Sequence, residues 1–290
     1  MTSAQNKVYH LLVATDFSEA SWCALQYAIL LFSSQPAVFY LLHVYQPPVP
    51  NTRLLGATVT DLSVSTLAHE AAHQGLIECI NRIDFAGKLP HHQFIPHASF
   101  DLLTEATRLL IDQHHIDFVF VGTKGQRPSS HLLWGSHTHK MVKAALKCPV
   151  IVVPEDSQLR LPKRMAMATD LKRPVHPWAV EPLLMMAERL DAQLDLVHVQ
   201  SYDQSLDEEQ SVHLERWQKL FGAGEYHRVR PQWDGSVSHA LTEFTQQSPL
   251  DLWAMQYFAH TWIEDLTKEA IVRKAVFSTQ VPLMVLPADC

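Results

Sequence analysis

The chain has 290 residues, an apolar content of 47% and a formal net charge of −7, so it can form one large domain or two of ordinary size. The acidic balance argues against a general nucleic-acid or anionic-membrane binder, because either would need a basic surface. No apolar run is long enough to span a bilayer, the N-terminus lacks a signal-peptide core, and the four cysteines lack CxxC spacing, so we expect a cytoplasmic protein without membrane partners.

Short apolar strands alternate with amphipathic helices in the first half of the chain. The first strand ends on Thr15-Asp16, and Ser18 follows as a helix N-cap. Strands are predicted at Tyr9–Ala14, Val38–Val44, Gln93–Ala98, Asp117–Val121 and Val150–Val153, with helices after Ser18, near Leu62–Phe85, at Ser99–Gln113 and at Thr138–Leu146. Apolar strands separated by helices are typical of a parallel sheet buried on both faces.

The second half of the chain repeats the first. Val13–Asp16 recurs as Met167–Asp170, and Pro149–Pro154 recurs as Pro282–Pro287. The offset between the copies falls by about 20 residues midway, so the first copy carries an insertion. Strands of the second copy are predicted at Met165–Ala168, Leu194–Val199, Tyr226–Gln232, Asp251–Met255 and Leu283–Leu286. We therefore predict two doubly wound, five-stranded parallel-sheet α/β domains in tandem, unit one (1–156) and unit two (157–290).

A glycine-rich loop follows the fourth strand and reads Gly122-x2-Gly125-x9-Gly135-Ser136. In an open parallel sheet, ligands bind beyond the carboxyl ends of the strands, where the strand order reverses. This rule brings Thr15-Asp16 and Val121-Gly122 together. Glycines let backbone N–H groups approach phosphate oxygens, and the helix that starts after Gly135 would add free donors for an anion.

The composition of this loop also suits a polyphosphate. Residues 118–154 contain no Asp or Glu, but they contain the cations Lys124, Arg127, Lys140 and Lys143. Lys124 is a candidate phosphate partner, although a solvated loop lysine explains it equally well. His137, at the predicted helix start, could donate to a phosphate.

These residues resemble the universal stress protein family. The resemblance rests on Val13–Asp16, Leu42–Val44, Asp117–Gly122, the glycine loop and Cys148–Pro154. It covers both units, and the glycine spacing matches the ATP-binding branch of the family. It implies a tandem pair of Rossmann-like domains of the adenine nucleotide alpha hydrolase type.

The resemblance also implies roles for individual residues. Asp16 and the Val44 backbone would contact adenine, and Val121 and Gly122 would lie against the adenosine. The phosphates would be held by Gly125, Gly135, Ser136 and Thr138. With Thr15, Lys124 and His137, these residues form the candidate site for ATP, or for AMP or ADP, with or without Mg²⁺.

Unit two has lost the glycine loop. Gln256 stands in place of Gly122 and Ala259 in place of Gly125, and the acidic residues Glu264, Asp265 and Glu269 would repel a phosphate. We therefore expect one nucleotide per chain, bound in unit one. The corresponding stretch is aromatic, with Trp253, Tyr257, Phe258 and Trp262, which indicates either core or interface packing or an apolar ligand or partner surface.

Three functional hypotheses remain from the sequence. The first is a stress-associated nucleotide sensor or regulator, the second a slow ATPase, and the third a nucleotide-independent scaffold or apolar-ligand binder that uses unit two. No catalytic set and no metal site can be read, because the loop offers no Mg²⁺ ligand and the eighteen histidines lack carboxylate or thiolate companions. The final strands of the units could pair within one chain as a pseudo-dimer, which leaves a homodimer of chains open.

Overall fold

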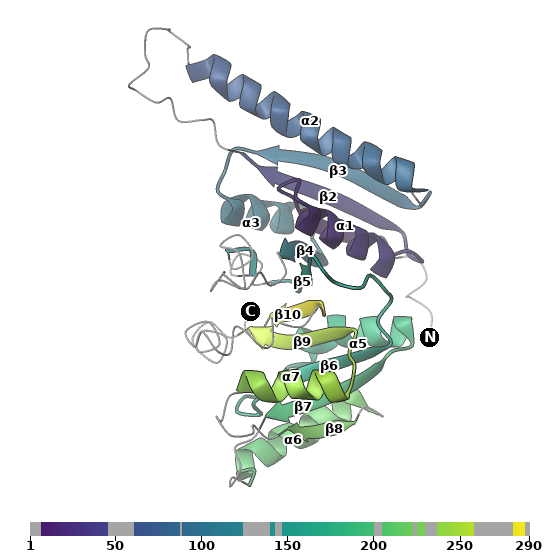
Figure 1. Ribbon diagram of the computed structural model, residues 1–290. Coiled ribbons are helices and arrows are strands. Elements are labelled where there is room, and N and C mark those ends of the chain that lie inside the picture. Colours follow the sequence, from purple (N-terminus) through teal and green to yellow (C-terminus); the bar gives the residue numbers. More distant parts are fainter. Residues whose placement is uncertain are drawn as a thin grey trace.

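The computed structural model describes residues 7–45, 61–87, 89–123, 140–142, 147–199, 205–222, 225–229, 237–257 and 281–287. Strands and helices alternate along unit one (Figure 1). Its elements are β1 (Tyr9–Ala14), α1 (Glu19–Leu31), β2 (Ala37–Val44), α2 (Asp61–Gly87), β3 (His92–Ser99), α3 (Leu103–His114), β4 (Phe118–Thr123) and β5 (Val150–Pro154). Residues 140–142 are also helical.

Unit two repeats this order, and its second helix is much shorter than that of unit one. Its elements are β6 (Arg164–Thr169), α5 (Pro177–Leu190), β7 (Gln193–Val199), α6 (Glu208–Phe221), β8 (Tyr226–Val229), α7 (Val237–Gln247), β9 (Leu252–Tyr257) and β10 (Leu283–Pro287). The insertion of the first copy falls largely in α2, which has 27 residues against 14 in its counterpart α6. In Figure 1, α2 extends past the edge of the sheet.

Ten strands form one sheet in the order β3-β2-β1-β4-β5-β10-β9-β6-β7-β8. Each half is a parallel sheet whose strand order reverses between its first and fourth strands, so the prediction of two doubly wound parallel units is confirmed. Strands β5 and β10 join the halves in an antiparallel pair, with Met284 opposite Ile151. Because this pair is antiparallel, the strands of the two units run in opposite directions. The carboxyl ends of the strands in unit one therefore lie on the opposite side of the sheet from those in unit two.

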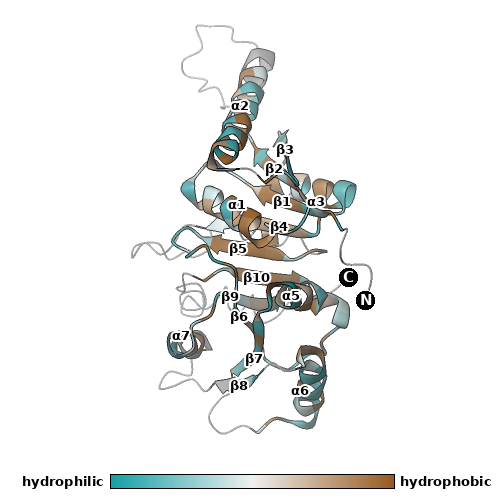
Figure 2. Cartoon of the chain, turned by 90° about the vertical axis from the view of Figure 1, so that its right-hand side faces the viewer, coloured by the Kyte–Doolittle hydropathy of each residue, from teal (hydrophilic) through white to brown (hydrophobic). Residues whose placement is uncertain are grey.

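Two apolar clusters cover the two faces of the sheet. One contains side chains from α1, α2, α5 and α6, and it runs from unit one into unit two. The other contains side chains from α3, from residues 141 and 142, and from α7. Figure 2 shows the most apolar segments in the central strands, as expected for strands buried on both faces.

The strand predictions agree closely with the structure, and most differences concern where elements begin and end. Helix α3 begins at Leu103 rather than Ser99, because the Ser99 hydroxyl donates to Asp101 (2.9 Å) and accepts from its N–H (3.2 Å), forming a turn. Strand β4 continues to Thr123, so Gly122 belongs to the strand. Residues 230–232 of the predicted eighth strand lie outside the described residues.

Candidate functional site

The candidate site begins where β1 and β4 end side by side. Ala14 on β1 pairs with Val121 on β4. Thr15 and Asp16 follow Ala14, and Gly122 follows Val121. The predicted residues at these two strand ends therefore lie together at one edge of the sheet, where the strand order reverses.

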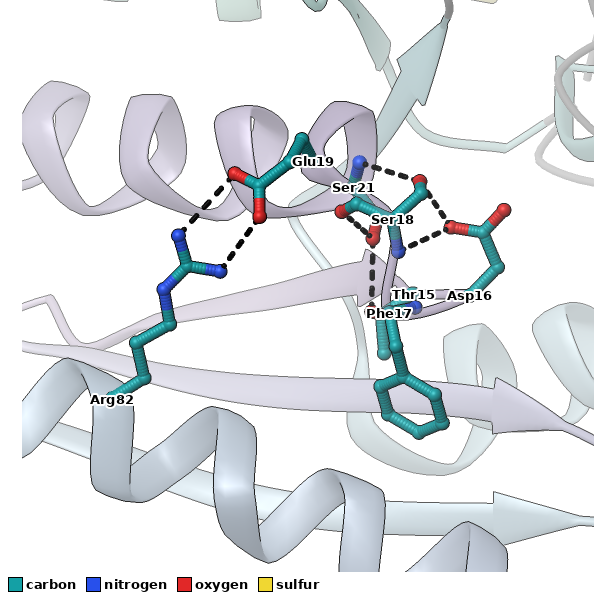
Figure 3. A network of polar contacts seen from close by, with 7 residues as sticks. All are labelled: Thr15, Asp16, Phe17, Ser18, Glu19, Ser21 and Arg82. Carbon is teal, nitrogen blue, oxygen red and sulfur yellow. Dashed lines mark hydrogen bonds and ion pairs between the residues drawn. The ribbon is translucent and has the colours of Figure 1, made fainter.

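The turn after β1 is organised by its own side chains (Figure 3). The N–H of Phe17 donates to Thr15 Oγ1 (3.0 Å), and the N–H of Ser18 donates to Asp16 Oδ1 (3.1 Å). Ser18 Oγ also donates to Asp16 Oδ1 (2.5 Å) and accepts from the N–H of Ser21 (3.3 Å). Ser18 is thus the N-cap of α1, as its sequence position predicts, and the same hydroxyl orients Asp16.

Asp16 is held as a carboxylate. Burial alone would raise its pKa, but hydrogen bonds from Ser18 and Ser21 outweigh that effect and lower the pKa below 3.8. The side chain remains exposed at the surface. Asp16 can therefore accept hydrogen bonds from an amine or hydroxyl ligand throughout the physiological pH range.

Thr15 is buried and links the turn to the neighbouring strand. Its hydroxyl hydrogen-bonds Ser21 Oγ (3.1 Å), and its N–H donates to the carbonyl of Leu42 on β2 (2.9 Å). His43 Nδ1 donates to the carbonyl of Thr15 (2.8 Å). Thr15 is therefore a structural residue of the site, since its polar groups already have partners inside the protein.

Gly122 lies against the backbone at the start of α1. A Cβ at this position would be 2.1 Å from the carbonyl oxygen of Ala20 and 2.7 Å from the nitrogen of Ser21. Only glycine permits this close approach. The family resemblance implies that Gly122 lies against the adenosine, and the structure adds that α1 packs on this residue and leaves no space for a side chain.

The backbone of Val44 is turned toward the candidate site. Leu42 accepts from Thr15 on the β1 side, whereas Tyr45 donates to Ser99 on β3 (2.9 Å). Backbone groups alternate between the two sides of a strand. The N–H and C=O of Val44 therefore point to the β1 side, just past the last paired residue of β1.

Phe17 is a site residue that the sequence reasoning missed. Its φ of 63° is in the left-handed region, and its ring stacks on the imidazole of His43 with centroids 4.3 Å apart. The ring remains 42% exposed. An aromatic residue directly after the Asp at a strand end was the available signal. The remaining predicted site residues, Lys124, Gly125, Gly135, Ser136, His137 and Thr138, lie outside the described residues.

Unit two retains the turn after its first strand. The N–H of Leu171 donates to Thr169 Oγ1 (3.1 Å), and the N–H of Lys172 donates to Asp170 Oδ1 (3.0 Å). Leu171 has a φ of 57°, close to that of Phe17. The turn is thus a property of the shared fold, and its presence alone does not define a nucleotide site.

The two units differ where Gly122 is replaced by Gln256. The Gln256 side chain is 7% exposed, and its Nε2 has no hydrogen-bond partner within the described part of the chain. Helix α1 begins at Glu19, three residues after Asp16, whereas α5 begins at Pro177, seven residues after Asp170. The early first turn of α1, which packs on Gly122, therefore has no counterpart at the start of α5.

Other features singled out in the sequence have structural partners. Trp253 is 1% exposed and donates to Thr245 Oγ1 (3.3 Å), so it belongs to the core of unit two. His91 and His92 donate to carbonyls at the end of α1, at 2.9 and 3.0 Å. Within the described ranges, no three His, Cys, Asp or Glu side chains gather as a metal site. Nor does any helix in the described part have the length and apolar character of a membrane span.

Comparison with known proteins supports the family resemblance. The model of the universal stress protein family matches residues 8–154. A universal stress protein from Archaeoglobus fulgidus DSM 4304 is similar in structure over 95% of this chain and 97% of its own, with a TM-score of 0.65 and 18% identity.

Two proteins from Pseudomonas aeruginosa have the same architecture. A functionally unknown protein from strain PAO1 gives a TM-score of 0.60 at 14% identity, over 98% of this chain and 94% of its own. A putative universal stress protein from strain UCBPP-PA14 gives 0.58 at 13% identity, over 98% and 95%. A search of curated proteins finds no match. The family match spans just over half of the chain, and this chain belongs to the universal stress protein family.

Proposed function

We propose that this chain is a stress-associated protein that holds one adenine nucleotide, ATP, ADP or AMP, in unit one and acts as a sensor or regulator. The observation that carries the proposal is the pairing of Ala14 with Val121, which puts the Asp16 carboxylate beside the strand that leads into the glycine loop. The carboxylate of Asp16 and the backbone N–H and C=O of Val44 are groups that can recognise the edge of a base or a ribose hydroxyl. The loop sequence, free of acids, suits the phosphates.

The same features favour holding a nucleotide over cleaving it. Fast hydrolysis needs a Mg²⁺ ligand and a residue that orients water. Asp16 is the acidic residue of the described site, and its Oδ1 already accepts from the backbone and hydroxyl of Ser18. We therefore propose that any ATPase activity is slow and that Mg²⁺, if it accompanies the nucleotide, is bound mainly by the phosphates.

The pseudo-dimer is part of the proposal. The antiparallel pair of β5 and β10 supports an arrangement in which one chain supplies both halves of a joined sheet. The proposed nucleotide then occupies only the edge formed by unit one, because Gln256 and the acidic segment replace the glycine loop in unit two. The stoichiometry expected is one nucleotide per chain.

Calorimetric titration with ATP, ADP and AMP, with and without Mg²⁺, tests this proposal. We expect one site per chain, and affinity lowered about tenfold or more in Asp16→Ala, because a hydrogen bond to a charged group is lost. Gly125→Val should abolish binding. Asp170→Ala, in the matching turn of unit two, is the control and should bind normally. Lack of binding by the wild type at millimolar nucleotide would overturn the proposal, and phosphate release from bound ATP would favour the slow ATPase.

A further inference from the structure

The loop that carries Asp16 is held against helix α2 through the ring of Phe17. One face of the ring stacks on His43, with an interplanar angle of 29°. Its edge reaches α2 at Gly75, where a Cβ would be 2.6 Å from Cζ of the ring and 2.8 Å from Cε2. A methyl group at residue 75 would therefore displace the ring from its present place between β2 and α2.

Gly75 is an unfavourable choice for the helix itself. It lies inside the 27-residue helix α2, where glycine is less stable than alanine because of its greater backbone freedom in the unfolded chain. Its φ is not among the positive values of the glycines, so the helix geometry does not require glycine there. The atoms that a side chain at residue 75 would meet are those of the Phe17 ring.

Phe17 also adopts a costly backbone conformation. A φ of 63° is unfavourable for a bulky residue and persists only when its surroundings impose it. Here the N–H of Phe17 donates to Thr15, and His43 both stacks on the ring and donates to the Thr15 carbonyl. The ring and the Asp16 turn are thus held by the same two neighbours, β2 and α2.

A second contact fastens the same loop to α2. The Arg82 guanidinium binds both carboxylate oxygens of Glu19, at 3.2 and 3.3 Å, in the first turn of α1 (Figure 3). It also lies over the ring of Trp22, 3.9 Å from the ring centroid. The Phe17 contact falls within the Asp16-Ser18 turn and the Glu19 contact directly after it, so a shift of α2 would be transmitted to the turn at two neighbouring positions.

We propose that α2 positions the Asp16 turn, with Phe17 and Gly75 as the positioning residues through which α2 sets the nucleotide affinity of unit one. This rests on the proposed function. Neither residue needs to touch the nucleotide. The contact between them fixes where the Phe17 ring lies between β2 and α2, and with it the position of the Asp16 turn relative to α2.

Unit two provides a natural comparison. The residue that matches Phe17 is Leu171, which is buried and adopts the same turn. Its carbonyl is bound by His213 of α6 at 2.7 Å, so the turn of unit two is held by a hydrogen bond from its helix. A leucine is therefore compatible with the backbone of the turn. The substitution Phe17→Leu should remove the contact of the ring with α2 without changing the turn type.

The substitution Gly75→Ala tests the inference. Alanine favours the helix, but its Cβ would displace the Phe17 ring. We expect ADP affinity to fall about tenfold, the effect of misplacing one hydrogen bond to a charged group. In the Phe17→Leu background, Gly75→Ala should cause no further loss, because the shorter side chain leaves room for the added methyl. Glu70→Ala, an exposed substitution on α2, is the control and should bind ADP as the wild type does.

Amide hydrogen exchange gives a second readout that needs no nucleotide. In Gly75→Ala, the N–H groups of Phe17 and Ser18 should exchange at least about fivefold faster, because their bonds to Thr15 and Asp16 are disturbed. Unchanged exchange at both amides would overturn the inference, even if the wild type binds no ADP. If the wild type binds ADP, equal ADP affinities of the wild type and Gly75→Ala would also overturn the inference. Failure of the wild type to bind ADP contradicts the proposed function alone, since the exchange rates still decide the role of α2.

Discussion

At Gly122 the packing of α1 leaves no space for a side chain. The missing Cβ would lie 2.1 Å from the carbonyl oxygen and 2.3 Å from the carbonyl carbon of Ala20. Both are backbone atoms of a helix, which cannot move aside as the end of a flexible side chain can. We expect Gly122→Ala to lower the free energy of unfolding by about 2 kcal/mol, the usual cost of overpacking, as measured by urea denaturation.

The matched control for Gly122 is Gly222, the C-cap of α6. Gly222 has a positive φ of 61° but open space around its Cβ position. Gly222→Ala should cost only about 1 kcal/mol, from backbone strain alone. If Gly122→Ala were as stable as the wild type, α1 would have to move away from β4 without a measurable cost, and the expected overpacking would be wrong.

Asp16 should make stability depend on pH in a defined window. Its pKa in the folded protein is lowered, mainly because the Ser18 hydrogen bonds outweigh burial. A lowered folded pKa means that the contribution is present above the unfolded value, near 3.8, and is lost as the pH falls through the folded pKa. Relative to Asp16→Asn, the wild type should therefore have a higher Tm from pH 5 to 8.

Since the Asp16 carboxylate is exposed, this difference in Tm should be no more than about 2 °C. Calorimetric scans between pH 2.5 and 8 would measure it. The gap should close below pH 4. A gap that widens at low pH would contradict the lowered pKa.

At the residue scale, local chemistry was predictable from the sequence and distant contacts were not. Ser18 as a cap and Asp16 at a strand end can be read from a few neighbouring residues. The contact of Phe17 with Gly75 joins positions far apart in the chain, so no local pattern around Phe17 reveals it. Gly122 was identified as important for its ligand, but the proximity of Ala20 became visible only with the fold.

At the scale of elements, the starts of α1 and α5 differ in a way that can be measured. Ser18 caps α1 with a side-chain hydrogen bond, whereas His176, the N-cap of α5, makes no side-chain cap bond. Ser18→Ala should therefore cost about 1 kcal/mol in the free energy of unfolding. His176→Ala should be close to neutral. Equal losses for the two variants in urea denaturation would show that the Ser18 hydroxyl contributes nothing as a cap.

Strand and helix order followed from hydrophobic patterning, but the ends of elements depended on side-chain turns. The strands were predictable because each is a short apolar run between polar segments. Helix α3 starts later than predicted because Ser99 and Asp101 bond to each other first. The late start of α5 could not be read from the sequence, since Pro177 marks a helix start only once the preceding residues are seen to be non-helical.

In the whole molecule, contacts between the units are extensive enough to couple their stabilities. Strands β5 and β10 pair, and one apolar cluster contains side chains of both units. Arg189 of α5 donates to the carbonyl of Leu31 (3.1 Å) and lies 4.5 Å from the centroid of the Phe32 ring. Tyr9 of β1 also donates to the sulfur of Met185 on α5 (3.2 Å). An element of unit two thus completes the core of unit one.

This coupling predicts that a destabilising substitution in unit two should also destabilise unit one. Met284 on β10 is fully buried opposite Ile151 on β5, so Met284→Ala leaves a cavity at the junction of the two halves. A cavity of this kind typically costs about 2–5 kcal/mol. If the halves unfold as one cooperative unit, amides of β1 and β4 should lose hydrogen-exchange protection by the same free energy as amides of β6 and β9. Faster exchange confined to β6 and β9 would instead mean that unit one keeps its own stability, and that the joined sheet connects two independently folding halves.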